Sequence, residues 1–247
     1  MDLPGELVDA VRGARRIAVL TGAGVSAESG LSTFRGPGGL WENQDLLSYA
    51  TPEGFARDPQ KVWEWYQWRR GQALLAQPNA GHRMLAGWES RLSGQGGRFD
   101  LLTQNVDGLH QAAGSKNVIE LHGSGWTLRC MDCGREEADR THPFPVLPPK
   151  CPACRGMLRP GVVWFGEQLP LEAAEAARRA ALACEFFLVA GTSGTVYPAA
   201  SYVELAAQAG AKTLEVNLEP TPLSGSVHWS LRGKSGEILP RIFEATK

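Results

Sequence analysis

The sequence lacks long apolar runs and has no excess of charge of either sign. None of its hydrophobic stretches approaches the roughly 20 residues that a membrane-spanning helix needs, and its 25 basic residues nearly balance 26 acidic ones. We therefore expect no membrane span and no binding of nucleic acid through overall charge. Internal repeats and low-complexity tracts are also missing. With 43% hydrophobic residues over 247 positions, the composition predicts a globular chain with a sizeable core.

Cysteine is scarce. The chain has five cysteines, an odd number that argues against the disulfide framework of a small secreted protein. The first residues also lack the apolar core of a signal peptide. Both features predict a cytoplasmic protein in a reducing compartment.

Four of the cysteines form two Cys-x-x-Cys pairs, Cys130 with Cys133 and Cys151 with Cys154, and seventeen residues separate the pairs. This spacing is typical of a Cys₄ zinc ribbon, in which four thiolates complete a tetrahedron and leave no position open for catalysis. We therefore predict one structural zinc ion. Disulfide bonds are the alternative, which a reducing compartment disfavours. Cys184 stands alone before an apolar run and is interpreted as a core residue.

Short apolar runs alternate with helical patterns along most of the chain. Such alternation predicts an α/β fold with a Rossmann-like open parallel sheet, whose ligands bind beyond the carboxyl ends of the strands. The runs that suit buried strands are residues 17–20, 99–103, 118–121, 186–190 and 213–216. The clearest helical patterns cover residues 3–14, 59–76, 171–184 and 198–209.

Two stretches interrupt this alternation, and we interpret both as insertions into a single domain of residues 1–247. A tryptophan-rich helical insertion covers residues 36–77, and a zinc-binding lobe covers residues 126–160. The lobe is too small to fold without its metal, and its proline-rich run is expected to be irregular. The Rossmann-like part then comprises residues 1–35, 78–125 and 161–247.

A glycine-rich turn follows the first predicted strand and reads Gly22-Ala-Gly24-Val-Ser26. Glycines let a backbone approach a pyrophosphate closely, although similar turns also occur for packing reasons. A dehydrogenase of this fold needs an acidic residue at the end of a second strand about 20 positions later. The corresponding segment, residues 41–45, reads as helical or irregular, which disfavours hydride transfer. Phe34 and Arg35 lie just past the turn, where a loop could close over a cofactor.

Polar side chains follow the next two predicted strands. Asn105 and Asp107 come after residues 99–103, and His122 comes after residues 118–121. Ligands bind at such strand ends, and a neutral histidine accepts a proton near pH 7. Asn105 and Asp107 can equally cap the next helix, and a lone histidine is often structural. Their common position at the edge of the sheet favours catalysis.

These motifs together resemble the sirtuins, which are NAD-dependent protein-lysine deacylases. The matching segments stand in family order and, with the four paired cysteines, cover nearly the whole chain. They are GAGVSAESGLSTFRG (22–36), TQNVDGLH (103–110), ELHG (120–123), FGE (165–167), GTSGTVYPAA (191–200) and VNLE (216–219). One departure is Ser32, where the family commonly has proline, and it adds freedom to the cofactor loop.

The resemblance implies NAD as cosubstrate, with His122 as the general base and Asn105 and Asp107 at the nicotinamide end. In the family mechanism the acyl oxygen attacks the ribose carbon as nicotinamide leaves, and the histidine then deprotonates a ribose hydroxyl. The products are free lysine, nicotinamide and O-acyl-ADP-ribose. The residues that the resemblance places around NAD are Gly22, Ala23, Gly24, Ser26, Glu28, Ser29, Thr33, Phe34, Arg35, Trp41, Gln104, Asn105, Val106, Asp107, Gly191, Thr192, Ser193, Asn217, Leu218, Glu219 and Ser235.

The same resemblance implies an acyl-lysine protein or peptide that binds as an added strand between residues 163–167 and 194–197. Tyr66 and Arg69 share one helix face and, with Ala50, resemble the desuccinylase and demalonylase branch. A buried guanidinium grips a carboxylate with two parallel hydrogen bonds, and a phenol adds a third. We therefore expect removal of succinyl and malonyl groups besides acetyl groups. The expected substrate contacts are Ala50, Tyr66, Arg69, Val163, Trp164, Phe165, Gly166, Glu167, Gly194, Val196 and Tyr197.

Three other interpretations remain open. A plain lysine deacetylase would share the fold, with Tyr66 on an ordinary amphipathic helix and Arg69 and Arg70 solvated. A nicotinamide-dependent oxidoreductase lacks its acidic residue after a second strand. The zinc lobe alone could be a module that binds protein or nucleic acid, but its basic residues exceed its acidic ones only slightly, which is a weak nucleic-acid signal.

Overall fold

The computed structural model describes residues 3–35 and 38–247, so Gly36 of the predicted glycine-loop motif lies outside the described residues, as do Met1, Asp2 and Pro37. Within the described part, six parallel strands form one sheet in the order β3-β2-β1-β7-β8-β9. This confirms the predicted α/β fold. The strands are β1 (Arg16–Thr21), β2 (Arg98–Thr103), β3 (Val118–Glu120), β7 (Phe186–Ala190), β8 (Lys212–Asn217) and β9 (Trp229–Arg232).

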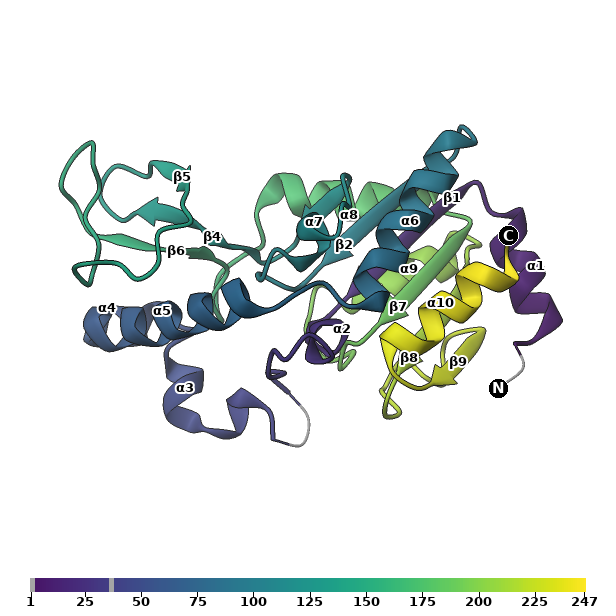
Figure 1. Cartoon of the computed structure of the whole chain (residues 1–247), viewed down its shortest axis with the longest axis horizontal. Helices are drawn as coiled ribbons and strands as arrows, with labels where there is room; N and C mark the ends of the chain where they lie inside the picture. Colours follow the sequence, from purple (N-terminus) through teal and green to yellow (C-terminus); the bar gives the residue numbers. More distant parts are fainter. Residues whose placement is uncertain (1–2, 36–37) are drawn as a thin grey trace.

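Both faces of the sheet are apolar because successive side chains of a strand point to opposite sides. Ile17 and Val19 of β1 belong to one core cluster, whereas Ala18 and Leu20 belong to the other. Helices α1 (Gly5–Gly13), α6 (Ala80–Gly94) and α10 (Ser235–Ala245) cover the first face, and α8 (Leu171–Ala183) and α9 (Ser201–Gln208) cover the second (Figure 1).

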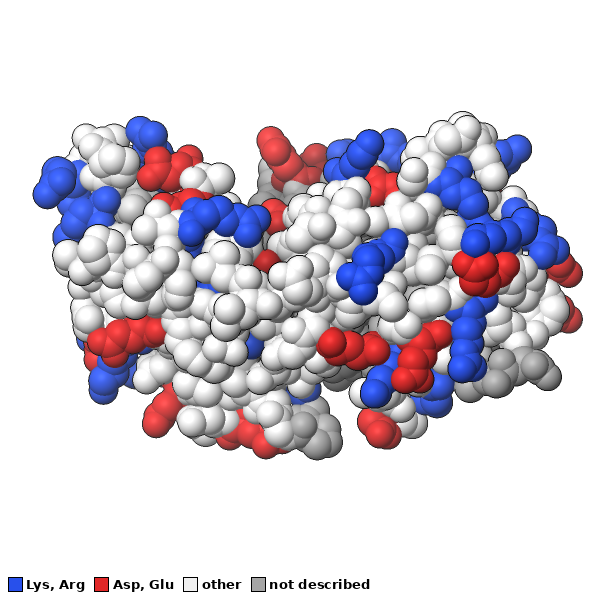
Figure 2. All heavy atoms as spheres, viewed as in Figure 1, with Lys and Arg blue, Asp and Glu red and all other residues white. Residues whose placement is uncertain are grey.

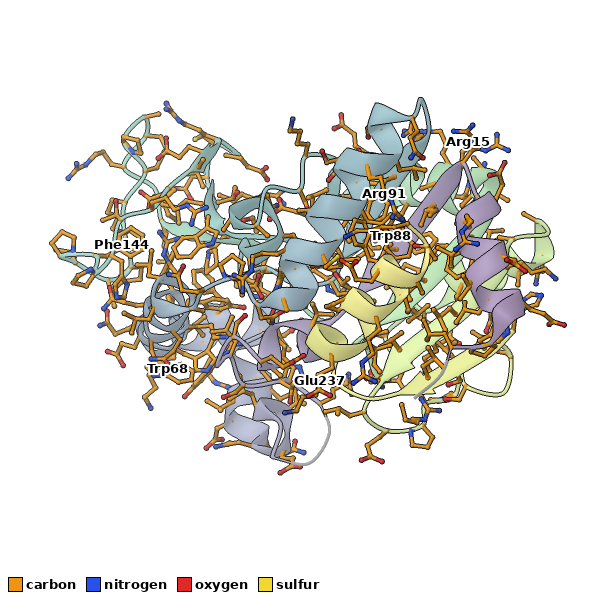
Figure 3. The ribbon with its side chains drawn as sticks, turned by 45° about the vertical axis from the view of Figure 1, so that its right-hand side comes forward. Arg15, Trp68, Trp88, Arg91, Phe144 and Glu237 are labelled. Atoms are coloured by element: carbon orange, nitrogen blue, oxygen red, sulfur yellow. The ribbon has the colours of Figure 1, made fainter. Side chains whose placement is uncertain are left out.

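Helices α6 and α10 lie side by side. Figure 3 shows Trp88 and Arg91 of α6 at their junction, where Trp88 is 1% exposed. Its ring lies 6.0 Å from that of Phe99 and 6.4 Å from that of Phe243. The predicted strands agree with the observed ones to within one residue at each end. Of the elements that form or cover the parallel sheet, strand β9 and helices α6 and α10 lack a prediction. The short edge strand β9 alternates with polar residues and carries no continuous apolar run.

The cysteine lobe (residues 126–160) contains a second, antiparallel sheet in the order β5-β4-β6. Its strands β4 (Gly123–Cys130), β5 (Glu136–Ala138) and β6 (Leu158–Val162) extend slightly beyond the expected borders of the lobe. The proline-rich residues 143–149 form neither helix nor strand, as predicted.

The tryptophan-rich insertion is helical and packs against the cysteine lobe, away from the parallel sheet (Figure 1). Asp58 caps α5 by accepting a hydrogen bond from the Lys61 amide. Trp63 of this helix donates a hydrogen bond to the Leu158 carbonyl. The elements are η1 (Leu40–Glu42), α3 (Gln44–Ser48), α4 (Pro52–Arg57) and α5 (Pro59–Leu75). No helix in the described residues is long and apolar enough to cross a membrane.

Candidate active site

A cavity of about 580 Å³ lies where the parallel sheet, α5 and the cysteine lobe meet. Its sheet side is formed by the loops after β1, β2 and β7, so it sits at the carboxyl ends of the central strands where the strand order reverses. A second cavity of about 220 Å³ shares Gly24, Gly191, Asn217 and Leu218 with the first. The two cavities therefore adjoin along these four residues, and they are together called the trough below.

Most of the residues predicted as catalytic, cofactor-binding or substrate-binding line the larger cavity. Glu28 and Ser235 line the smaller one, and the Glu28 carboxylate accepts a hydrogen bond from the Gly236 amide at the start of α10. Ser29 and Gly194 line neither of these two cavities. Ser29 instead accepts a hydrogen bond from the Asn79 side chain.

The glycine turn after β1 serves packing as well as the cavity. A Cβ atom on Gly22 would come within 2.8 Å of the Gly191 carbonyl oxygen, and a Cβ on Gly24 would come equally close to that atom. The Gly24 amide donates a hydrogen bond to the same oxygen. The helix that follows, α2 (Ala23–Ala27), is only five residues long. The packing interpretation of the turn is therefore correct, since its glycines allow two strand-end loops to touch at the cavity wall, and the binding of a pyrophosphate there stays a prediction.

Ser26, on α2, connects the two predicted nicotinamide-binding residues. Its hydroxyl donates to the Asp107 carboxylate at 2.7 Å and accepts from the Asn105 amide at 3.2 Å. His82 approaches the same hydroxyl at 3.4 Å through Nε2, while its Nδ1 accepts from the Asn79 amide. Burial lowers the pKa of His82 to about 4, so the ring is neutral at pH 7 and Nε2 carries the proton.

Asp107 has two roles. One carboxylate oxygen accepts from Ser26, and the other accepts from the Leu109 amide at the start of α7 (Leu109–Ala112). Asn105 is 6% exposed and also donates to the Gly22 carbonyl. The N-cap residue of α7 is Gly108 rather than Asp107, so Asp107 binds the first helical amide from one residue before the cap and also lies on the cavity wall.

His122 follows β3 and lines the cavity. Its Nδ1 lies 3.1 Å from the Gln104 carbonyl oxygen, which can only accept, so Nδ1 carries the proton and the lone pair is on Nε2. Burial lowers the pKa of His122, and the Gln104 hydrogen bond only partly opposes this shift. The ring is therefore neutral near pH 7 and can accept a proton at Nε2.

The opposite wall of the cavity is aromatic. Phe34 stacks on Trp41 with ring centroids 4.9 Å apart, and Trp41 meets the edge of Phe165 at 5.9 Å. Tyr66 is 7% exposed, and its hydroxyl accepts a hydrogen bond from Trp164 at 2.8 Å. Burial raises the pKa of Tyr66 far above its usual range, so the phenol keeps its proton and retains it for donation.

Arg69 lines the same cavity and crosses from α5 to the cofactor loop. One of its Nη atoms donates to the Ser32 carbonyl at 2.9 Å, and its guanidinium lies 5.0 Å from the centre of the Phe34 ring. Burial lowers the pKa of Arg69, and the charge of Asp107 opposes that shift. No carboxylate among the described residues lies within 4.0 Å of this guanidinium, which stays protonated.

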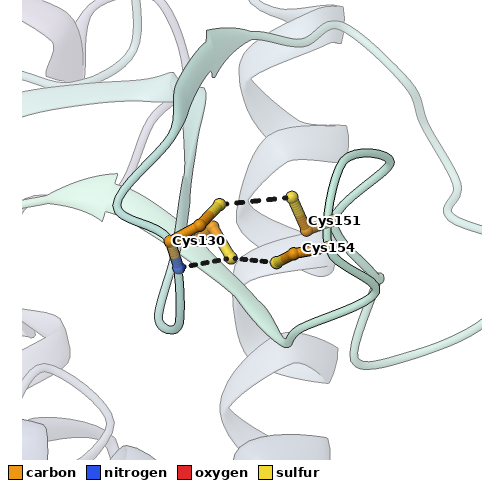
Figure 4. Close-up of side chains that lie close together, drawn as sticks. Cys130, Cys151 and Cys154 are labelled. Atoms are coloured by element: carbon orange, nitrogen blue, oxygen red, sulfur yellow. Dashed lines mark hydrogen bonds between the residues drawn. The ribbon is translucent and has the colours of Figure 1, made fainter.

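The four paired cysteines come together within the cysteine lobe, and Cys130 and Cys151 belong to the core that the lobe shares with α5. Their sulfur atoms all lie within 4.8 Å of one another, and Figure 4 shows them turned toward a common centre. Cys130 and Cys154 are 3.4 Å apart, and Cys133 and Cys151 are 3.8 Å apart. Zn–S bonds of about 2.3 Å in a tetrahedron require sulfur separations of roughly 3.8 Å. The predicted ligand set therefore fits one structural zinc ion.

Comparisons with known proteins agree with this geometry. The Sir2 family model matches residues 22–198. The chain belongs to the Sir2 family, so the sirtuin resemblance is confirmed. It is 49% identical to an NAD-dependent protein deacylase of Aquifex aeolicus over 92% of this chain and 94% of that protein. A Sir2 homolog–NAD complex superimposes with a TM-score of 0.90 at 42% identity, over 99% of this chain and 94% of that chain. A Sir2–p53 peptide–NAD⁺ structure gives 0.83 at 31% identity, with 99% and 98% covered.

Three residues of this Sir2 chain were missed by sequence reasoning. His82 gives no signal beyond its place in a helix-capping motif, and Trp126 is one of eight tryptophans. The interpretation that Arg69 and Arg70 are both solvated is wrong for Arg70, which is 4% exposed and forms an ion pair with Asp139 at 2.8 Å. Both Trp126 and Arg70 line the cavity.

Proposed function

We propose that this Sir2-family chain is an NAD-dependent protein-lysine deacylase with His122 as general base. The observation that carries the proposal is the convergence of His122, Asn105 and Asp107 on one cavity at the strand-order reversal. These side chains follow two neighbouring strands, β2 and β3, and all three border the same open space.

NAD, when bound, supplies the ribose carbon to which the acyl oxygen is transferred. The chain's own residues bind and orient the reactants. Ser26 holds the Asp107 carboxylate at the nicotinamide end, and the glycine turn lets the pyrophosphate approach the backbone closely. Gln104 is fixed by its hydrogen bond to Thr192, which ties the β2 loop to the β7 loop across the trough.

His122 accepts a proton from a ribose hydroxyl. Its Nδ1–H is fixed on the Gln104 carbonyl, which leaves Nε2 as the basic atom. Because Nδ1 already donates to a carbonyl, the imidazolium that forms on protonation keeps this hydrogen bond and is stabilised by it. The aromatic wall limits water at the reacting centre.

The peptide would bind as a strand along residues 163–167. Several amides of this segment are already used, because Val163 donates to the His122 carbonyl and Phe165 donates to the Ala50 carbonyl. Trp164 donates to the Glu167 carboxylate, which Arg159 also holds. The segment would therefore present mainly carbonyl groups to a peptide, so recognition would depend little on side-chain sequence.

We further propose a preference for succinyl and malonyl over acetyl groups. Arg69 supports this, since it is a largely desolvated cation on the cavity wall with one Nη bound to Ser32 and further N–H groups to spare. Tyr66 adds a phenolic O–H nearby on α5. A carboxylate on the acyl group would pair with this half-buried charge, whereas acetyl would leave it unpaired.

The decisive experiment incubates the protein with NAD and matched acetyl- and succinyl-lysine peptides, and measures nicotinamide release. His122→Ala should lower the steady-state rate of release by roughly 10² to 10⁴. An oxidoreductase would instead show stereospecific hydride transfer without free nicotinamide, and near-normal turnover in His122→Ala would contradict the mechanism.

The same proposal makes the cysteine lobe a structural support. Four thiolates occupy every position of a tetrahedral zinc ion, so the metal would hold the lobe and take no part in the reaction. Reduced cysteines of this kind fit a cytoplasmic location. Acidic and basic side chains are interspersed over the face shown in Figure 2, which gives a nucleic-acid-binding role no support there.

A further inference from the structure

Trp126 connects the cysteine lobe to the nicotinamide end of the cavity. It lies on β4, is 5% exposed and lines the cavity. Its indole Nε1–H donates a hydrogen bond of 2.7 Å to the main-chain carbonyl of Asp107. The side-chain carboxylate of the same Asp107 accepts a hydrogen bond from the Ser26 hydroxyl. The indole therefore fixes the backbone of the residue whose side chain faces the cavity.

The turn after Asp107 is shaped around this indole. Gly108 has a left-handed backbone with φ of +77°, and a Cβ atom there would come within 2.9 Å of Trp126 Nε1. Just before it, the Val106 carbonyl accepts a hydrogen bond from the Gly125 amide. Strand β4 thus holds two successive carbonyls of the loop, one through its main chain and one through the indole.

Two guanidinium groups restrain the indole ring. Arg140 lies over it at 4.3 Å and Arg70 at 4.9 Å, both within the range of a cation–π contact. Arg70 in turn donates to the Gly125 carbonyl at 2.8 Å and forms the ion pair with Asp139. The ring is therefore held from α5 and from the lobe, so that its hydrogen bond to Asp107 is preorganised.

We propose that Trp126 is a positioning residue for Asp107 and that it sets the affinity of the site for the nicotinamide part of NAD. This rests on the proposed function, which places nicotinamide beside Asp107. Loss of the indole N–H would release the Asp107 carbonyl and let the carboxylate shift, while the adenosine end of the trough, lined by Asn217, Leu218 and Ser235, would be unaffected.

Trp63 supplies a matched control. It too is a buried tryptophan at the junction of α5 and the lobe, and its Nε1 donates at 2.8 Å to a main-chain carbonyl, that of Leu158. This carbonyl lies away from the cavity lining. Replacement of either tryptophan by phenylalanine removes one indole hydrogen bond, but only Trp126→Phe removes one that touches Asp107.

The test measures dissociation constants of NAD and of ADP-ribose, which lacks nicotinamide, together with the thermal unfolding midpoint. Trp126→Phe should weaken NAD binding about three- to tenfold, the range that the loss of one buried hydrogen bond gives. ADP-ribose binding should stay within about twofold, and Trp63→Phe should change neither constant by more than that. Arg140→Gln, which leaves the indole in place, should shift NAD binding in the same direction by less.

Equal weakening of NAD and ADP-ribose by Trp126→Phe, or a NAD effect no larger than that of Trp63→Phe, would overturn the inference. If Trp126→Phe unfolds at a much lower temperature than the wild type, the same comparison of NAD and ADP-ribose binding is made with Arg140→Gln. Equal weakening of both ligands in that variant would then overturn the inference. A wild-type protein that binds no NAD would refute the proposed function instead, so the two failures are distinguishable.

Discussion

The parallel-sheet part has one kind of core, and the part formed by the cysteine lobe and α5 has another. Core side chains on the two faces of the sheet are mainly aliphatic, such as Leu20, Val19 and Leu188. The core between α5 and the lobe is instead aromatic, with Trp63 and Phe144 in edge contact at 5.3 Å, and it contains the buried Arg70. In Figure 3, Phe144 lies near the left end of the molecule, and Trp88 of the sheet part lies to the right of the centre.

This difference follows from size and backbone pairing. Six strands with helices on both faces bury a large aliphatic surface. The lobe has a single three-stranded sheet and a small core, in which rings, a guanidinium and four cysteines come together. The proposed catalytic side chains come from the sheet part, whereas the acyl-binding candidates Tyr66 and Arg69 come from α5. Chemistry and acyl selectivity should therefore be separable.

The largest effect on activity is expected from a substitution in the parallel-sheet part. His122→Ala should lower the rate of deacylation by roughly 10² to 10⁴, the usual contribution of a general base. The thermal midpoint should shift by no more than roughly 2 °C, since the half-buried ring has one hydrogen bond. Steady-state kinetics and calorimetry measure the two quantities. A large loss of stability would place His122 in a structural role.

The next largest effect on activity is expected from a substitution of a zinc-ligand candidate in the cysteine lobe. Cys151→Ser should release zinc and lower activity by at least about tenfold, because the lobe folds with its metal. Cys184→Ala is the matched control, since this cysteine lies under the parallel sheet and its thiol only donates to the Ala181 carbonyl. It should keep one equivalent of zinc and near-normal activity. Zinc content below one equivalent in the wild type, with the fold retained in strong chelator, would refute the zinc site.

Arg69→Met tests whether α5 selects the acyl group. Desuccinylation should fall at least about tenfold, because a charge-assisted hydrogen bond contributes roughly 1.5–3 kcal/mol. Acetyl removal should be spared. The variant also removes the hydrogen bond to the Ser32 carbonyl, so the competing explanation is that Arg69 only holds the loop at Ser32. Equal loss with acetyl- and succinyl-lysine peptides would show that Arg69 only holds the cofactor loop.

The smallest expected effect is that of mildly acidic pH on kcat/KM. Burial holds the pKa of His122 below its usual 6.5, so protonation removes the base only at lower pH. At pH 6.5 more than half of the enzyme therefore still has neutral His122, and kcat/KM should remain above roughly half of its plateau. A pH profile of kcat/KM measures this. An acid limb centred above pH 6.5 would contradict the burial argument.

Much of the fold could be predicted from the sequence because its signals are local. Continuous apolar runs predicted five of the six strands of the parallel sheet, and glycine turns follow β1 and β7. The edge strand β9 could not be found this way, because Ser230 and Arg232 interrupt its apolar residues to bind Glu215. Of the candidate site, the polar residues after β2 and β3 were visible as motifs, whereas His82 and Trp126 were not.

The sequence by itself determined the zinc ligand spacing, the alternating α/β order and the motifs of the Sir2 family, because each depends on residues close together in the chain. Only the tertiary structure decided between the two neighbouring arginines. Arg69 turns to Ser32 and the cavity, and Arg70 turns to Asp139 and the lobe. The physical reason is that burial and hydrogen bonding depend on partners from distant segments, which no local pattern of residues encodes.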